Sequence, residues 1–394
     1  MQNPVFIPGP TNMPEFLRKA VDVPTLDHRS AAFAEVLKPA LAGVRQVIRS
    51  ADAEVFLFPS TGTGGWEIAI TNTLSPGDRV LAARHGMFSH RWIDLCERHG
   101  LDVEKIEVTW GNGLPADRYA AVLAADRDHR IKAVLATHNE TATGVVSDIA
   151  AIRHALDAAG HPALLLVDGV SSIGSMDFRF DDWGVDIAVT GSQKGFMLPP
   201  GLAIVAFSPK AMAATETARL SRCFFDIRDM GRSYYFGLYP YTPPVGLICG
   251  LKEACNFLLA EGLENVFARH TRIADGVRAA AAAWGMPLAA LSPELQSQTI
   301  TAIRTPAGFN ATDIVTRAAQ VYDTAFGTGL GELAGKVFRF GHLGVMSDLT
   351  ALSGLAVLEM CMADLGLPVR LGSGVAAAQQ VYRTTAAPVL KQAA

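Results

Sequence analysis

One lysine stands in a setting that suits covalent chemistry. Lys194 follows an apolar run at 187–189 and the small residues of 190–193, and it precedes an apolar, proline-containing segment at 196–201. A lysine flanked in this way is poorly placed for a solvated surface, and desolvation lowers the pKa of its ammonium group. Because the neutral amine attacks carbonyl carbons to form a Schiff base, the pattern predicts a nucleophilic lysine.

An acidic residue lies 26 positions earlier, where another very apolar run ends. Asp168 closes the run 164–167. Ligands of open α/β sheets gather at the carboxyl ends of strands, although a strand-end Asp can also be a helix cap. If both runs are strands, Asp168 and Lys194 could hold opposite sides of one aromatic cofactor.

A third segment could bind phosphate. Residues 59–67, Pro-Ser-Thr-Gly-Thr-Gly-Gly-Trp-Glu, join an apolar run to a helical pattern, and a helix N-terminus presents free N–H groups to an anion. No Lys-Ser/Thr pair follows the glycines, as a Walker loop requires, and Glu67 stands where the dinucleotide fingerprint needs glycine. Taken alone, the segment fits a turn that binds nothing equally well.

The elements that position these residues can be read from hydrophobic patterning. Continuous apolar runs, typical of strands buried on both faces, occur at 55–58, 80–83, 133–136, 164–167, 187–189 and 203–206. Helical spacing at 91–99 and 149–159 lies between them, so the alternation predicts a mostly parallel α/β sheet over about residues 50–210.

The C-terminal third has a different pattern. A long Ala- and Leu-rich helical stretch covers 245–284, and strand-like pieces follow at 299–304 and 337–340. The tail at 376–394 suggests a surface helix with a frayed end. We therefore expect an N-terminal arm at 1–20, a large domain at 21–260 and a small α/β domain at 261–394.

Composition excludes several classes of protein. With 394 residues, 49% hydrophobic and 18% charged, the chain should be globular with two or three domains. A formal charge of -4 gives no strong attraction to nucleic acid or an anionic membrane. Five scattered cysteines and the lack of a signal or membrane segment predict a cytoplasmic protein with reduced thiols. No close set of metal-ligating residues is visible, so we expect no metal.

Together these segments resemble the class V group of fold-type I pyridoxal-phosphate aminotransferases, especially the glyoxylate aminotransferases. The resemblance runs from 7–12, Ile-Pro-Gly-Pro-Thr-Asn, to 336–342, and the run Gly-Ser-Gln-Lys at 191–194 is its most specific signal. Segments 27–30, 58–67 and 87–92 look like those of the bacterial enzymes. The resemblance implies a large domain with a mostly parallel seven-stranded sheet flanked by helices, plus a smaller C-terminal α/β domain.

The resemblance also implies the roles of individual residues. Lys194 would bind pyridoxal 5'-phosphate as a Schiff base and move the substrate proton, and Asp168 would pair with the pyridine nitrogen to keep the ring an electron sink. Phe88 and Val170 would pack on opposite faces of the ring, with Thr141 or Thr143 near its hydroxyl group. The phosphate would be held by Thr61, Gly62, Thr63 and Gln193.

Two further implications concern the substrate and a second subunit. Arg339 would bind the substrate α-carboxylate through a bidentate fork. Tyr239 and Thr242 resemble residues that the family sends onto the phosphate of the neighbouring subunit, which implies a homodimer with a shared active site.

The implied reaction transfers an amino group from L-aspartate or L-serine to glyoxylate by a ping-pong mechanism and forms glycine. Segments 223–230 and 371–379 look more like an aspartate–glyoxylate enzyme. Aspartate needs a second cation, for which the candidates are His28, Arg29, Arg91, Arg222 and Arg228. The alternatives are an alanine–glyoxylate aminotransferase and a non-catalytic binding protein, although the latter would be expected to lack Lys194 or Asp168.

Overall fold

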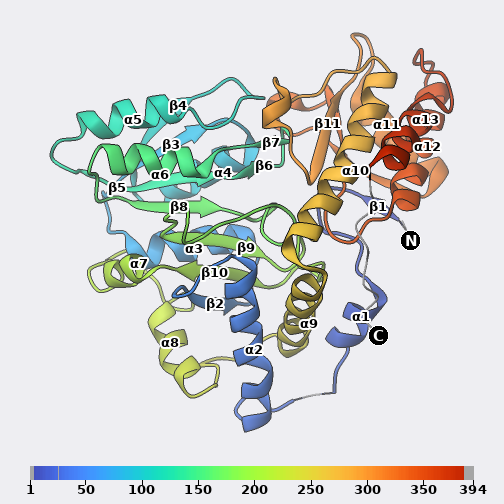
Figure 1. Ribbon diagram of the computed structural model, residues 1–394. Helices are drawn as coiled ribbons and strands as arrows, with labels where there is room; N and C mark the ends of the chain where they lie inside the picture. The colour runs from blue at the N-terminus through green and yellow to red at the C-terminus, as the bar shows by residue number, and fades with distance from the viewer. Residues whose placement is uncertain (1–3, 25, 386–394) are drawn as a thin grey trace.

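The computed structural model describes residues 4–24 and 26–385, and its largest element is a seven-stranded sheet (Figure 1). β10 runs antiparallel to both of its neighbours, whereas the other neighbouring pairs are parallel. In sheet order the strands are β2 (Glu54–Phe58), β10 (Ala203–Phe207), β9 (Ile187–Gly191), β8 (Leu164–Asp168), β5 (Ile131–Thr137), β3 (Arg79–Arg84) and β4 (Asp102–Glu107). The expectation of a mostly parallel seven-stranded sheet is confirmed.

The central strands are continuously apolar because helices cover the sheet. Every residue of β8, β9 and β10 is buried. The covering helices of this part of the chain are α2 (Ala31–Val47), α3 (Gly62–Thr73), α4 (Met87–Arg98), α5 (Ala116–Ala125), α6 (Ile149–Ala158), α7 (Pro209–Ala214), α8 (Ile227–Tyr235) and α9 (Val245–Glu261). The edge strand β4 has three exposed residues out of six and is mostly charged, so its sequence contains no continuous apolar run.

The remaining elements form a second α/β layer beside the first (Figure 1). Its four-stranded sheet has the order β1 (Val5–Phe6), β12 (Ala325–Thr328), β13 (Val337–Gly341) and β11 (Ile300–Arg304). Its helices are α10 (Leu263–Ala283), α11 (Ala311–Tyr322), α12 (Asp348–Asp364) and α13 (Ser373–Thr384). The predicted tail helix corresponds to α13, and residues 386–394 lie outside the described residues.

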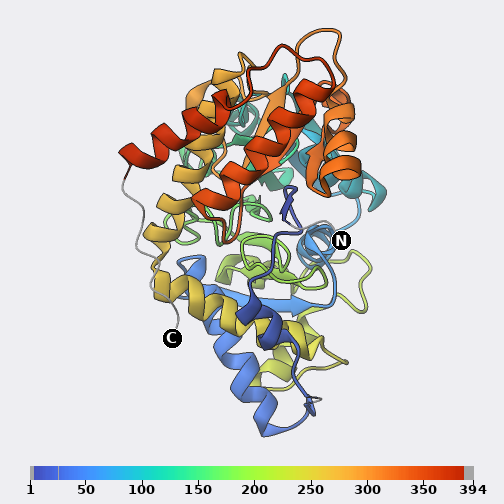
Figure 2. The same ribbon diagram turned by 90° about the vertical axis from the view of Figure 1, so that its right-hand side faces the viewer.

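The N-terminal segment belongs structurally to this second sheet. Strand β1 pairs in parallel with β12, and the Phe6 ring lies 5.2 Å from Phe326 and 4.8 Å from Phe340 between ring centroids. The chain then runs to α1 (Glu15–Val21), which packs on α9 (Figure 2). Residues 7–14 therefore connect the two layers. The short strands β6 (Asn139–Glu140) and β7 (Val145–Val146) form a separate pair.

The predicted helical stretch at 245–284 corresponds to two consecutive helices, α9 and α10. Gly262, at φ +85°, ends α9 and begins α10 in a backbone conformation that glycine adopts without steric cost. One buried apolar cluster surrounds the large sheet and another packs around the small sheet, while the domain boundary near residue 260 stays a prediction. Among the described residues, no helix is both long and apolar enough to cross a membrane.

Candidate active site

A cavity of about 300 Å³ opens where β8 and β9 end. This is the edge at which open α/β sheets bind ligands. Nine residues singled out from the sequence line it, namely Thr61, Gly62, Thr63, Phe88, Thr141, Asp168, Val170, Gln193 and Lys194. Five further residues complete the lining, namely Gly9, Pro10, Trp66, Ser171 and Pro200.

Lys194 is buried at the base of this cavity. Its Nζ donates a hydrogen bond to the carbonyl oxygen of Pro8. Burial lowers the pKa of Lys194 to about 8, and the positive charge of Arg339 acts in the same direction, while Asp168 opposes both. At pH 7 a lysine with this pKa is neutral in about a tenth of molecules, against about 0.03% at the usual pKa. The environment therefore favours the nucleophilic form.

The N-terminal segment closes the cavity over the lysine. Gly9 has φ +102°, and a Cβ atom placed on it would lie 2.6 Å from Cδ and 2.8 Å from Nζ of Lys194. The backbone N–H of Thr11 donates to the carbonyl oxygen of Gln193 at 3.2 Å. The segment thus packs against the lysine side chain, and a larger residue at position 9 would require that side chain to move.

Asp168 is the second buried ionisable group. Burial raises its pKa to about 7, even though the Val170 N–H donates to its Oδ1 at 2.9 Å. The nearby Glu140 raises this pKa further, and Lys194 counteracts it. A carboxyl group of this kind is close to half protonated at neutral pH and would ionise fully beside a cation. The pocket therefore offers a place for a positively charged ring atom.

The opposite end of the cavity has the properties of an anion site. It is formed by the N-terminus of α3, where Thr61 makes no side-chain capping bond and the first N–H groups have no intrahelical acceptor. A Cβ atom on Gly62 would lie 2.5 Å from Val170, so the backbone approaches the cavity closely. Phosphate binds readily at helix N-termini of this kind.

Phe88 is positioned by an acidic residue that the sequence analysis missed. The carboxylate of Glu140, which is fully buried, accepts hydrogen bonds from the N–H groups of Phe88 at 3.1 Å and Ser89 at 2.9 Å. It also accepts one from Ala142 at 3.1 Å. Glu140 thereby caps α4 and fixes where the Phe88 ring enters the cavity. Glu140 follows β5 much as Asp168 stands at the end of β8, and this position could have marked Glu140 as a candidate site residue.

The structure brings Thr141, rather than Thr143, to the cavity. Thr141 donates through Oγ1 to Ser171 Oγ at 2.7 Å, whereas Thr143 bonds the carbonyl oxygen of Glu140 at 3.3 Å. Arg339 lies behind Thr141 and does not itself line the cavity. Its Nη1 donates to the Thr141 carbonyl at 3.0 Å and its Nε to that of Thr328 at 2.7 Å. Burial lowers the pKa of Arg339 to about 10, so the side chain remains charged at neutral pH.

Tyr239 and Thr242 do not reach the cavity of their own chain. The Tyr239 hydroxyl is buried and donates to the carbonyl oxygen of Leu57 at 2.7 Å. Thr242 is exposed on the surface. Their assignment to a neighbouring subunit stays a prediction.

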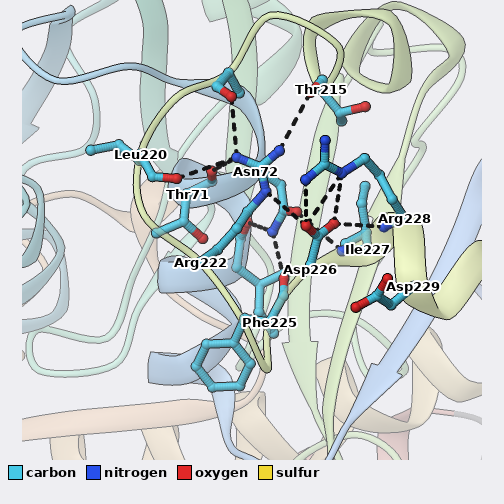
Figure 3. Close-up of polar contacts among 12 residues, drawn as sticks. Thr71, Asn72, Thr215, Leu220, Arg222, Phe225, Asp226, Ile227, Arg228 and Asp229 are labelled. Atoms are coloured by element: carbon cyan, nitrogen blue, oxygen red, sulfur yellow. Dashed lines mark hydrogen bonds and ion pairs between the residues drawn. The ribbon is translucent and has the colours of Figure 1, made fainter. Parts of the chain in front are cut away.

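The five candidate cations differ clearly in their surroundings. Arg228 forms a bidentate pair with Asp226 at 3.0 and 2.6 Å, and Arg222 lies 3.6 Å from the same carboxylate while donating to the carbonyl oxygen of Thr71 (Figure 3). Both are thus engaged by Asp226, the N-cap residue of α8. Arg29 is exposed and His28 half-buried. Arg91 contacts a residue of the cavity, because its Cζ lies 5.5 Å from the centroid of the Phe88 ring.

A buried lysine and a buried aspartate at neighbouring strand ends, in one cavity with a helix N-terminus that can bind an anion, form a site that could hold a phosphorylated aromatic aldehyde as a Schiff base. Residues 12–321 match the class-V aminotransferase family, and the chain belongs to that family.

Individual relatives cover almost the whole chain. The L-aspartate–glyoxylate aminotransferase of Paracoccus denitrificans is 70% identical over 393 residues, covering 100% of this chain and 99% of that protein. The serine–glyoxylate aminotransferase of Hyphomicrobium methylovorum is 50% identical over 384 residues, covering 97% and 95%. The crystal structure of a pyridoxamine–pyruvate aminotransferase from Mesorhizobium loti matches with a TM-score of 0.90 at 29% identity, covering 97% of each chain. The protein is therefore an aminotransferase of fold type I.

Proposed function

We propose that this protein is a pyridoxal-phosphate-dependent aminotransferase that transfers the amino group of L-aspartate, and less readily of L-serine, to glyoxylate to form glycine. The observation that carries the proposal is the single cavity that joins Lys194, Asp168 and the N-terminus of α3. The names of the relatives at 70% and 50% identity support glyoxylate as acceptor and these two donors.

The residues of the cavity fit the cofactor that the family implies. The free N–H groups at the start of α3 would donate to the phosphate, whose other proposed contacts are Thr61, Gly62, Thr63 and the side-chain N–H of Gln193. Phe88 and Val170 would pack on the ring, and Thr141 would bond near its hydroxyl group. When bound, the cofactor supplies an electron sink for the pair released when the substrate Cα–H bond breaks.

Side chains of this protein would bind the cofactor, move the proton and orient the substrate. Lys194 would bind the cofactor covalently and, once released by substrate, carry the proton from the substrate Cα. Asp168 would hold a fixed negative charge beside the pyridine nitrogen. Backbone carbonyl oxygens accept hydrogen bonds from the Nε and Nη1 groups of Arg339, and its Nη2 group would orient the α-carboxylate. Because the donor product leaves before the acceptor binds, ping-pong kinetics are expected.

The proposal is tested by measuring glycine formed from glyoxylate with each amino donor alone. We expect kcat/KM to be highest for L-aspartate, lower for L-serine and lowest for L-alanine. A preference for L-alanine would favour the alternative of an alanine–glyoxylate enzyme. Cofactor binding without glycine from any donor would instead indicate a non-catalytic binding protein.

We also propose a cytoplasmic homodimer in which Tyr239 and Thr242 reach the partner's phosphate site. Tyr235 and Phe236, at the end of α8, are 82% and 70% exposed, and exposed aromatic groups of this kind often mark an interface. The five cysteines are all unpaired, in keeping with a reducing compartment. Light scattering at micromolar concentration should give twice the chain mass, and a monomeric active enzyme would contradict the shared site.

The lowered pKa of Lys194 predicts the pH dependence of cofactor attachment. Since burial brings the pKa down from 10.5 to about 8, the neutral amine becomes the main form above about pH 8. When apoprotein is mixed with pyridoxal 5'-phosphate, the rate of covalent attachment should rise about tenfold per pH unit below this value and level off above it. A rate that continues to rise to pH 10 would show that the lysine is not perturbed.

Replacing Gly9 by Ala should impair catalysis through the lysine. The new Cβ would lie within 2.8 Å of three Lys194 atoms, so the side chain must move, and a misplacement of about 1 Å can cost about 10²-fold in turnover. Gly77→Ala is a matched control, because Gly77 also has positive φ, +80°, but nothing lies within 4 Å of the added carbon. The control should lose about 1–2 kcal/mol of stability and keep its turnover. Equal activity of the two variants would contradict the proposed contact.

A further inference from the structure

Arg91 is a cation beside Phe88, a residue that lines the cavity, and the reaction described above does not use it. It is the fifth residue of α4, one turn after Phe88, and its guanidinium lies over the Phe88 ring at 5.5 Å. A cation over an aromatic face is weakly attracted to it, which holds the otherwise exposed side chain beside the cavity. Its position is therefore defined by a residue that lines the proposed cofactor site.

Arg91 has no acidic partner among the described residues, unlike comparable arginines near it. Arg98 on the same helix pairs with Asp94 at 2.9 Å, and Arg84 pairs with Glu107 at 2.9 Å. The acid on this side of the cavity is Glu140, and both of its carboxylate oxygens accept hydrogen bonds from backbone N–H groups. A guanidinium without a carboxylate beside a ligand cavity is a ready site for a ligand carboxylate.

Arg91 and Arg339 are also electrostatically coupled. Burial is the main cause of the lowered pKa of Arg339, Glu140 opposes it, and the positive charge of Arg91 lowers it further. Arg91 and Arg339 each carry a positive charge, and the nearby acid, Glu140, already accepts hydrogen bonds from backbone N–H groups. The two arginines therefore leave an excess of positive charge. A ligand with two negative charges would relieve this repulsion, whereas a ligand with one would leave Arg91 unpaired.

We propose that Arg91 binds the side-chain carboxylate of a dicarboxylic amino donor while Arg339 binds its α-carboxylate. This inference rests on the proposed function and names the residue that would make the site prefer aspartate to serine. Of the other candidates, Arg222 and Arg228 are already compensated by Asp226 (Figure 3). Glyoxylate has a single carboxylate, so the acceptor half of the reaction should not need Arg91.

The proposal is tested by Arg91→Gln in the holoenzyme, with Arg98→Gln on the same helix as a matched control. For Arg91→Gln we expect kcat/KM for L-aspartate to fall by about 30- to 1000-fold, mainly through KM. The values for L-serine and for glyoxylate should stay within about threefold of wild type. Arg98→Gln should leave all three values unchanged.

A second measurement does not depend on turnover. Calorimetric titration of the holoenzyme with maleate, a four-carbon dicarboxylate without an amino group, should show tighter binding than with butyrate. Arg91→Gln should abolish this difference, and Arg98→Gln should keep it. Loss of the preference for maleate in the Arg91 variant would support the proposal even if its turnover were altered for another reason.

Two results would overturn the inference. If Arg91→Gln lowers kcat/KM equally for aspartate and serine, Arg91 acts only through the position of Phe88. If the variant keeps the wild-type preference for aspartate and maleate, the second carboxylate is bound elsewhere. Failure of the proposed function looks different, because wild-type protein would then form no glycine from any donor.

Discussion

Replacing Lys194 by Ala is expected to abolish turnover, with a fall of at least about 10⁴-fold, which is the upper range for loss of a general acid–base group. The lysine is buried at the base of the cavity, and Gly9 and Pro8 cover its side chain. Among the described residues, no other lysine lines the cavity. The variant should also lack the absorbance of the lysine-bound cofactor, which a spectrum of the purified protein would show directly.

Chemical rescue separates loss of the amine from loss of structure. Methylamine is small enough to enter a cavity of about 300 Å³ and should restore part of the turnover of Lys194→Ala. Lys105→Ala provides a control, since Lys105 is paired with Glu97 at the surface, and this variant should behave as wild type. Near-normal turnover of Lys194→Ala without added amine would remove the lysine from the mechanism.

Replacing Asp168 by Asn should lower kcat by about 10²- to 10⁴-fold, because removing one partner of a buried charge pair costs about 3–5 kcal/mol. The amide has nearly the same shape and its oxygen can still accept the Val170 N–H, so the fold should be retained. The contacts proposed for the phosphate are untouched, and cofactor should still bind. Stopped-flow measurement of the aspartate half-reaction would report the loss.

Asp168→Asn should also lower the pKa of Lys194. Asp168 raises the pKa of Lys194, so its replacement should move that pKa below about 8 and shift the pH profile of cofactor attachment to lower pH. Asp148→Asn is a suitable control, because Asp148 caps α6 by accepting the Ala151 N–H and Asn caps helices equally well. Turnover of Asp168→Asn within threefold of the Asp148→Asn control would contradict the role given to Asp168.

The sequence predicted those parts of the fold whose signal is local. Strands β8, β9 and β10 are buried on both faces, and this burial requires the unbroken apolar runs that reveal them. Strand β4 lies at an edge and carries charged residues, and β1 has two residues, so neither gave such a run. The pairing of β1 with β12 joins segments that lie far apart in the chain, and no local pattern indicates it.

Some residues of the candidate site could likewise be predicted from local sequence patterns, and others could not. Lys194 and Asp168 could be predicted because residues at the ends of apolar strands meet at one edge of a sheet. The contact of Gly9 with Lys194 and the capping of α4 by Glu140 depend on how distant segments pack. No local sequence pattern predicts such contacts. The choice among the five cations was open for the same reason, since Asp226 compensates two of them only in the folded chain.

Amino transfer from L-aspartate through a cofactor bound to Lys194 can be tested by a single half-reaction. Purified holoenzyme is mixed with L-aspartate in the absence of an acceptor while its absorption spectrum is followed, and glyoxylate is then added. We expect rapid conversion of the lysine-bound cofactor to its amine form, faster than with L-serine, and full reversal by glyoxylate. An unchanged spectrum with every amino donor would contradict it.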